Sequence, residues 1–347
     1  MGVFRPRREP PPPALPLRRA LMEGAGALFV ALLVGIAFMA AYVGALHDPE
    51  PVDVPVGVVR GDQPAQQLLA AVRAQGRQLE AVSFPDRAAA DRALQRRDIY
   101  AVLATATGAA GLTLTIASAA GPAATSAITQ ILTVAAQRAQ VPLAVTDAVP
   151  VSPDDPHGVV PFYLALGLLI GGYFGGIALS LGLGTVPSRA SRGGLRVAGL
   201  AVHAALLGLA GALIAEPIMG IWHNNFAGLF GAGALIAYAA GLFAAAVQSW
   251  LARFGTVLII LILVVLGNPG SGGIYPPEFL PPFFRGVHLW NIPGLGSELI
   301  RSVIYFTVDA GRWPAAKLAV WCVASAALLF AATAVLGRPR RPAPSAP

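Results

Sequence analysis

Five apolar runs of about twenty residues constrain the fold of this chain more than any other feature. Crossing a hydrocarbon core about 30 Å thick takes roughly 20 predominantly apolar residues, because an α-helix rises about 1.5 Å per residue. A sixth run, residues 254–267, is shorter and reaches full length only with Trp250 and Leu251. We therefore predict a mainly α membrane protein built on a six-helix transmembrane bundle. The five clear spans are residues 25–46, 159–183, 197–215, 227–247 and 315–336.

The first apolar run also has features of a secretory signal peptide. Arg18 and Arg19 precede it, and Val43, Gly44 and Ala45 near its end would pass as a cleavage site. A signal core has about 7 to 15 apolar residues, whereas residues 25–46 number 22. The length favours a retained first span.

Arginine placement predicts the orientation of the spans. Short cytoplasmic loops hold an excess of Arg and Lys, and the two tails and two short loops carry twelve arginines. All twelve lie on the cytoplasmic side if the N-terminus is inside and the sixth run is a span. We expect a multi-pass plasma-membrane protein with both termini cytoplasmic, in tails 1–24 and 337–347. The arginines are Arg5, Arg7, Arg8, Arg18, Arg19, Arg189, Arg192, Arg196, Arg253, Arg338, Arg340 and Arg341.

The net charge of +7 comes from these tails and loops. It forms no basic stripe along a predicted helix or domain, so we expect the lipid membrane, and no nucleic acid, as the partner of these charges.

Residues 47–158 form a polar insert between the first and second spans. Short alternating segments predict strands, and longer segments with polar faces predict helices, so we expect an α+β extracytoplasmic domain. Its eight arginines against eleven acidic residues argue against a broad basic face. Predicted strands cover residues 52–59, 79–84, 99–105, 112–118 and 142–149, and predicted helices cover 64–75, 86–98 and 122–140, with Asp86 capping the second helix.

Sequence motifs for catalysis are lacking. A phosphate-binding loop needs a lysine beside a Gly-rich turn, and the single lysine, Lys317, lies within a predicted span. There is one cysteine, Cys322, and no G-x-S-x-G, H-E-x-x-H or C-x-x-C motif. We expect no enzyme activity and no catalytic, cofactor-binding or metal-binding residues. Any ATPase would be a separate chain.

The second span carries glycines at intervals of four residues. Glycines so spaced let helix backbones approach closely, which favours packing within the bundle. A face that lines a substrate pathway is the alternative. The two rows are Gly167, Gly171 and Gly175, and Gly172 and Gly176.

Polar residues gather at the outer end of the third span. Glu216, His223 and Asn224 lie between two apolar runs, close to the expected membrane surface. Ionisable groups deep in lipid are candidates for function, but groups at the interface more often belong to an ordinary loop. We keep them as candidates for an outer gate.

Residues 268–314 form an outer segment that we expect to be re-entrant or amphipathic. Residues 295–306 predict an amphipathic helix that lies on or dips into the outer membrane surface, with packing at the interface as its ordinary role. Glu298 and Arg301 lie three positions apart on its polar face, where their side chains can pair. They complete the candidate outer gate. The predicted apolar face is Leu295, Leu299, Ile300, Val303, Ile304 and Phe306.

The chain resembles the membrane subunits of type 2 ABC exporters, and within them the YhgE/Pip-like group. The similarity lies in one span, a large outer domain and five further spans. The outer domain opens with HDPEPVDVPVGVV (47–59) and closes with HGVVPFYLALGLLIGGYFGG (157–176). The last outer loop contributes GNPGSGGIYPPEFLPPFFR (267–285) and PGLGSELIRSVIYF (293–306).

This resemblance implies an exporter permease, a homodimer, that moves a hydrophobic, lipid-like or drug-like substrate with an ABC ATPase supplied as a separate subunit. The chain departs from the better-defined exporters in its N-terminal tail. Prolines at 10–13 and 16 interrupt any coupling helix there, and only residues 17–24 remain as a candidate. The group also includes proteins linked to phage adsorption and secretion. The alternative is therefore a non-transporting surface protein whose outer domain binds a partner.

Overall fold

The computed structural model describes residues 17–337 apart from residues 109, 224 and 289. Five helices in this part are long and apolar enough to cross a membrane, which is the architecture of a multi-pass membrane protein. They confirm the five clear spans predicted from the sequence. Tail residues 1–16 and 338–347, and the gate candidate Asn224, lie outside the described residues. The five helices are α1 (Leu17–Leu46), α5 (Val160–Leu183), α6 (Ala190–Leu213), α7 (Phe226–Leu251) and α11 (Val308–Leu336).

The sixth apolar run forms α8 (Arg253–Ile260) and continues as the π-helical turn η3 (Leu261–Leu266). A sharp turn at Ala252, which has a φ of 48°, separates it from α7. The apolar helix Phe254–Leu266 is about 20 Å long at about 1.5 Å per residue. It is shorter than the hydrocarbon core, so a sixth crossing stays a prediction.

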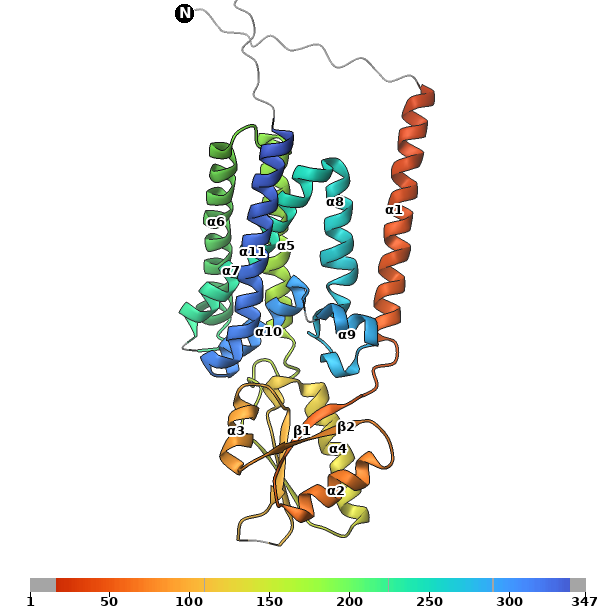
Figure 1. Ribbon diagram of the computed structural model, residues 1–347, viewed down its shortest axis with the longest axis vertical. Coiled ribbons are helices and arrows are strands. Elements are labelled where there is room, and N and C mark those ends of the chain that lie inside the picture. Colours follow the sequence, from red (N-terminus) through yellow and green to blue (C-terminus); the bar gives the residue numbers. More distant parts are fainter. Residues whose placement is uncertain (1–16, 109, 224, 289, 338–347) are drawn as a thin grey trace, which may run out of the picture.

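Helix α7 lies at the centre of the membrane-spanning part and packs on α5, α6 and α11. Small residues make this close packing feasible: Ala240, Gly241 and Ala244 are buried on α7. The sequence predicts one bundle of six, whereas the structure has four closely packed helices with α8 and α1 beside them (Figure 1). Helix α1 packs mainly on η3 and on the 3-10 turn η4 (Pro269–Ser271).

Residues 47–158, called the outer domain after their predicted location, contain every strand and helix predicted for them, within a few residues at the ends. Its five-stranded sheet has the order β2-β1-β3-β4-β5, in which only the β3–β4 pair is antiparallel. Helices α2 and α4 pack on one face around Leu69 and Ile128, and α3 packs on the other around Leu94. The elements are β1 (Val54–Val59), α2 (Gln63–Arg73), β2 (Leu79–Phe84), α3 (Arg87–Gln95), β3 (Ala101–Thr105), β4 (Leu112–Ile116), η1 (Ser118–Ala120), α4 (Pro122–Arg138) and β5 (Leu143–Asp147).

The predicted cap of the second domain helix is present. The Ala89 backbone N–H donates to Asp86 Oδ1 over 2.7 Å, which satisfies one of the free amides in the first turn of α3.

The segment after η3 folds between the spans and the outer domain. It contains η5 (Pro277–Phe279), α9 (Pro282–His288) and α10 (Ile292–Tyr305). Helix α10 is buried on both of its faces, so its polar face packs against protein. Its predicted location at the outer membrane surface stays a prediction. Leu299 and Ile300 pack with α5, α7 and α11, while Arg301 and Ser302 are 5% and 0% exposed against the outer domain.

The outer domain lies at one end of the helices. The described start of α1 and the described end of α11 both lie at the opposite end (Figure 1). The helices therefore present the two described chain ends on one side and the domain on the other.

Candidate functional site

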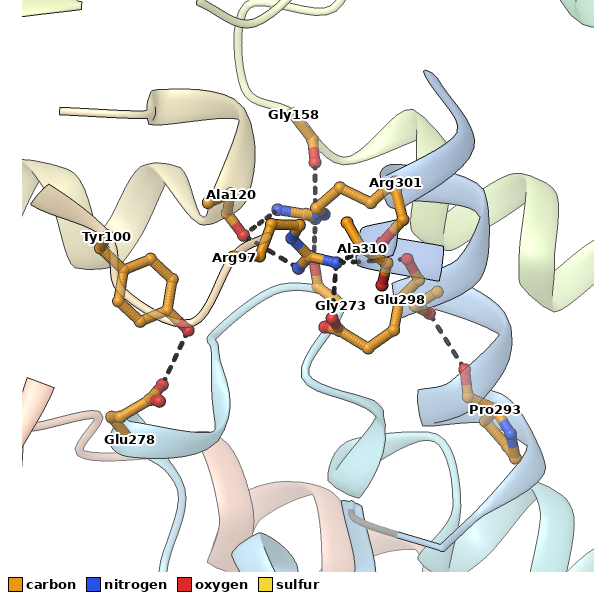
Figure 2. A network of polar contacts seen from close by, with 12 residues as sticks. Arg97, Tyr100, Ala120, Gly158, Gly273, Glu278, Pro293, Glu298, Arg301 and Ala310 are labelled. Atoms are coloured by element: carbon orange, nitrogen blue, oxygen red, sulfur yellow. Dashed lines mark hydrogen bonds and ion pairs between the residues drawn. The ribbon is translucent and has the colours of Figure 1, made fainter. Parts of the chain in front are cut away.

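A tight turn after α3 joins the outer domain to α10. Arg97 has a φ of +64°, in the left-handed region that non-glycine residues seldom adopt. Its side chain is 9% exposed, and Nη1 lies 2.6 Å from Glu298 Oε2. Nη1 also donates to Ser302 Oγ over 3.0 Å, and Nη2 donates to the carbonyl of Ala120 over 3.3 Å (Figure 2).

Arg301 holds four segments together through backbone carbonyls. Its Nη2 donates to Gly158 O over 3.0 Å and to Gly273 O over 3.4 Å, and its Nη1 donates to Ala120 O over 3.3 Å. The predicted Glu298–Arg301 pair is therefore wrong among the described contacts: Glu298 pairs with Arg97, because the turn after α3 brings a guanidinium closer to the carboxylate. We call Arg97, Glu298 and Arg301, with the carbonyls they bind, the junction.

A second contact crosses the same interface. The Tyr100 hydroxyl donates to Glu278 Oε2 over 2.9 Å (Figure 2). This bond joins the residue before β3 to the turn η5, which precedes α9. Burial raises the pKa of the Tyr100 hydroxyl well above its ordinary value, and the charges of Glu278 and Glu298 add to this. Burial also raises the pKa of the Glu278 carboxyl.

Opposing effects set the ionisation of Glu298. Burial alone would raise its pKa, but the positive charges of Arg97, His288 and Arg301, and the hydrogen bond from Arg97, outweigh burial and leave the pKa of Glu298 below its ordinary value. Burial and the nearby Arg97 lower the pKa of the Arg301 guanidinium from its ordinary value. The junction therefore holds two arginines near an ionised glutamate at neutral pH.

The other outer-gate candidates lie in the loop between α6 and α7. A π-helical turn, η2 (Ile214–Ile218), carries Glu216, whose Oε1 accepts the Asn225 N–H over 2.8 Å at the start of α7. The His223 side chain is exposed. This loop contacts the end of α10 through Trp222, whose Nε1 donates to the Tyr305 hydroxyl over 3.0 Å. Trp222 and Asn225 of this loop thus contact α10, whereas no described hydrogen bond joins Glu216 or His223 to Glu298.

The glycines of α5 divide into two groups by what an added Cβ would meet. A Cβ at Gly172 or Gly176 would lie 2.3 or 2.4 Å from backbone carbonyls of α7, and at Gly171 or Gly175 it would meet Leu207 or His203 of α6. These four positions are sites of close helix packing. A Cβ at Gly167 would meet nothing within 4 Å.

Gly167 lines an apolar cavity of about 360 Å³ between α5 and α6. Its walls include Leu164, Leu207, Gly211 and Ile214, and Met219 and Ile221 lie at its outer end. The volume is within the about 300–1,000 Å³ typical of ligand pockets. It could hold part of a hydrophobic molecule that enters from lipid.

In the described part of the chain, no group of three or more His, Cys, Asp or Glu side chains could hold a metal ion. The residues that sequence reasoning missed are Arg97, Tyr100 and Glu278. Local pattern treats Arg97 as one of several solvated arginines after a polar helix, and its contact with Glu298 spans 201 positions.

Comparison of the chain with protein-family models, curated proteins and solved structures finds no match.

Proposed function

We propose that this chain is the permease-like membrane subunit of an ABC-type exporter, with a separate ATPase that acts at the end opposite the outer domain. The observation that carries the proposal is the junction. A buried helix, α10, touches α5, α7 and α11 on one side and the outer domain on the other. A movement of the spans that displaces α10 must therefore alter Arg97–Glu298 and the carbonyl contacts of Arg301.

Local energetics support a junction that can open. Arg97 adopts a strained backbone conformation, which costs about 1–3 kcal/mol. Its Nε is buried and has no hydrogen-bond partner among the residues described. An unmade buried hydrogen bond costs about 1–3 kcal/mol. These two costs lower the net stability of the Arg97 contacts. Such contacts suit an interface that changes between two arrangements better than one that serves stability alone.

A hydrophobic or lipid-like substrate suits the cavity beside Gly167, which opens between two spans. The arginine-rich tails and loops support a cytoplasmic location for both termini and for the α5–α6 and α7–α8 turns. The ATPase would dock there, and a homodimer of this chain would complete the pathway.

A photo-crosslinking amino acid at Arg189, which is exposed in the α5–α6 turn, tests the partner in intact membranes. We expect an adduct with a nucleotide-binding protein, and none from the same group placed at exposed Gln75 of the outer domain. Recovery of no ATP-binding adduct from Arg189 would remove the main support for the exporter.

A non-transporting surface protein is the second candidate, and β5 favours it. This strand lies at the sheet edge, and most of its side chains are exposed, with Val145 at 42%. Edge strands pair readily with another chain. Deletion of residues 47–158 should then abolish partner binding, and unchanged binding would exclude this candidate.

A further inference from the structure

A polar pocket lies where the outer domain meets the first turns of α11. It has a volume of about 490 Å³, and Arg96, Asp98, Asp309, Arg312 and Trp313 line it with two alanines. We call it the interfacial pocket. It is separate from the junction, although Arg96 and Asp98 flank Arg97 in sequence: Arg97 is buried, whereas its two neighbours are about half exposed.

The pocket lies at the depth of lipid headgroups. The last charged residue before the uninterrupted apolar stretch of α11 is Lys317, and Leu318 begins that stretch. Arg312 and Trp313 precede Leu318 by about 8–9 Å along the helix. The headgroup layer on each side of the hydrocarbon core is about 5–8 Å thick. Trp313 is 77% exposed, as expected for a tryptophan in the interfacial aromatic belt.

Both signs of charge line the pocket in equal number. Arg96 Nε lies 3.0 Å from Asp98 Oδ2, and Arg312 Nη1 lies 3.4 Å from Asp309 Oδ1. These pairs are exposed and therefore weak. Within the described residues, Arg96 uses only Nε for its partner, so its terminal nitrogens remain available for an anionic oxygen.

We propose that the interfacial pocket binds the headgroup of a zwitterionic phospholipid in the leaflet next to the outer domain. Arg96 and Arg312 receive the phosphate, and Asp98 and Asp309 receive the ammonium. Complementarity of charge selects this occupant: an anionic headgroup would satisfy the arginines and leave two aspartates beside a negative charge. Binding here does not depend on transport or on any ATPase.

Native mass spectrometry of the full-length chain, released from a nonionic detergent, tests this proposal. Phosphatidylethanolamine and phosphatidylglycerol with the same acyl chains are added at equal concentrations. We expect the chain to retain phosphatidylethanolamine about tenfold better, since charge-assisted hydrogen bonds of this kind suffice for one factor of ten.

Two variants give opposite signatures. Arg312→Gln should lower retention of both lipids about tenfold, because both need the phosphate contact. Asp309→Asn should lower the retention of phosphatidylethanolamine alone and so remove the preference for it over phosphatidylglycerol. The matched control is Arg138→Gln, which removes an arginine from a pocket between α2 and α4 of the outer domain. Equal retention of the two lipids by the unaltered chain, or variants that behave like Arg138→Gln, would overturn the proposal.

Discussion

Arg97 of the outer domain and Glu298 of α10 form an ion pair, with Nη1 and Oε2 at 2.6 Å, across 201 positions of sequence. Their side chains are 9% and 25% exposed, so the pair is largely shielded from water. Glu298 also lies on the helix that packs against three spans. The position of the outer domain is therefore coupled to the packing of the membrane helices.

Removal of the Glu298 charge should loosen this coupling. In Glu298→Gln, Arg97 stays buried with its charge uncompensated, and we expect a loss of about 2 kcal/mol, below the range for fully buried pairs because Glu298 is partly exposed. Thermal unfolding of the full chain in detergent measures it. Arg77→Gln, at an exposed pair with Asp53, serves as the control and should change stability by less than about 0.5 kcal/mol. Equal effects of the two substitutions would contradict a special role for the junction.

Acid should weaken the same contact. The pKa of Glu298 in the folded protein lies below its ordinary value of 4.5, so its stabilising effect is complete above that value and is lost as the pH falls through the lower, folded pKa. The buried Glu278 carboxyl, whose pKa is raised, acts in the opposite direction. We expect the melting temperature of Glu298→Gln to fall less steeply below pH 4.5 than that of the unaltered chain. Protonation of Glu278 stabilises the folded chain as the pH falls from its raised folded pKa to 4.5, so Glu278→Gln should lack that gain in stability above pH 4.5. Parallel pH profiles for all three would refute this assignment.

Sequence patterns predict much of this fold because its elements are local. Apolar runs long enough to cross lipid give α1, α5, α6, α7 and α11, and alternation with a capping Asp86 gives the strands and helices of the outer domain. The packing arrangement of the helices is harder to predict from the sequence. Periodicity shows that α10 has an apolar face, but the burial of its polar face depends on a domain that ends more than 130 positions earlier in the chain.

The candidate site shows the same division. Glu298 and Arg301 could be singled out because charges on a mostly apolar helix are unusual, and both lie in the junction. Arg97 could not, since it differs from Arg96 only in its backbone conformation: a left-handed turn buries one arginine and leaves the other exposed. Propensity does not predict such a turn at an arginine.

Cysteine labelling should place the two ends of the molecule on opposite sides of the membrane. In a Cys322→Ala background, we expect a membrane-impermeant maleimide to label Gln75→Cys on whole cells. Arg189→Cys should be labelled only after permeabilisation, since arginine-rich loops stay cytoplasmic. Both positions are exposed, so accessibility decides the result. Labelling of Arg189→Cys on intact cells would show that the α5–α6 turn faces the outside. That result would contradict the predicted topology and the proposed docking of an ATPase at this turn.

Substitution of single α5 glycines by alanine can distinguish positions that serve helix packing from positions that line a substrate pathway. A Cβ at Gly172 would lie 2.3 Å from the Ala237 carbonyl oxygen and 2.8 Å from its Cα. Backbone atoms cannot move aside as a side chain can, so Gly172→Ala must push α5 away from α7, and we expect a loss of about 1–3 kcal/mol. Gly167→Ala places its methyl group in open space and should be neutral or stabilise the helix by up to about 1 kcal/mol.

Thermal unfolding of both variants in the same detergent provides the comparison. A larger substitution, Gly167→Phe, then fills the cavity between α5 and α6 and leaves the α5–α7 contact intact. If that cavity receives the substrate, export of an apolar dye from vesicles should fall several-fold while the melting temperature stays near that of Gly167→Ala. Unchanged export by Gly167→Phe would show that the cavity does not receive the substrate and is part of the lipid-facing surface. Helix packing would then be the role of the glycine rows.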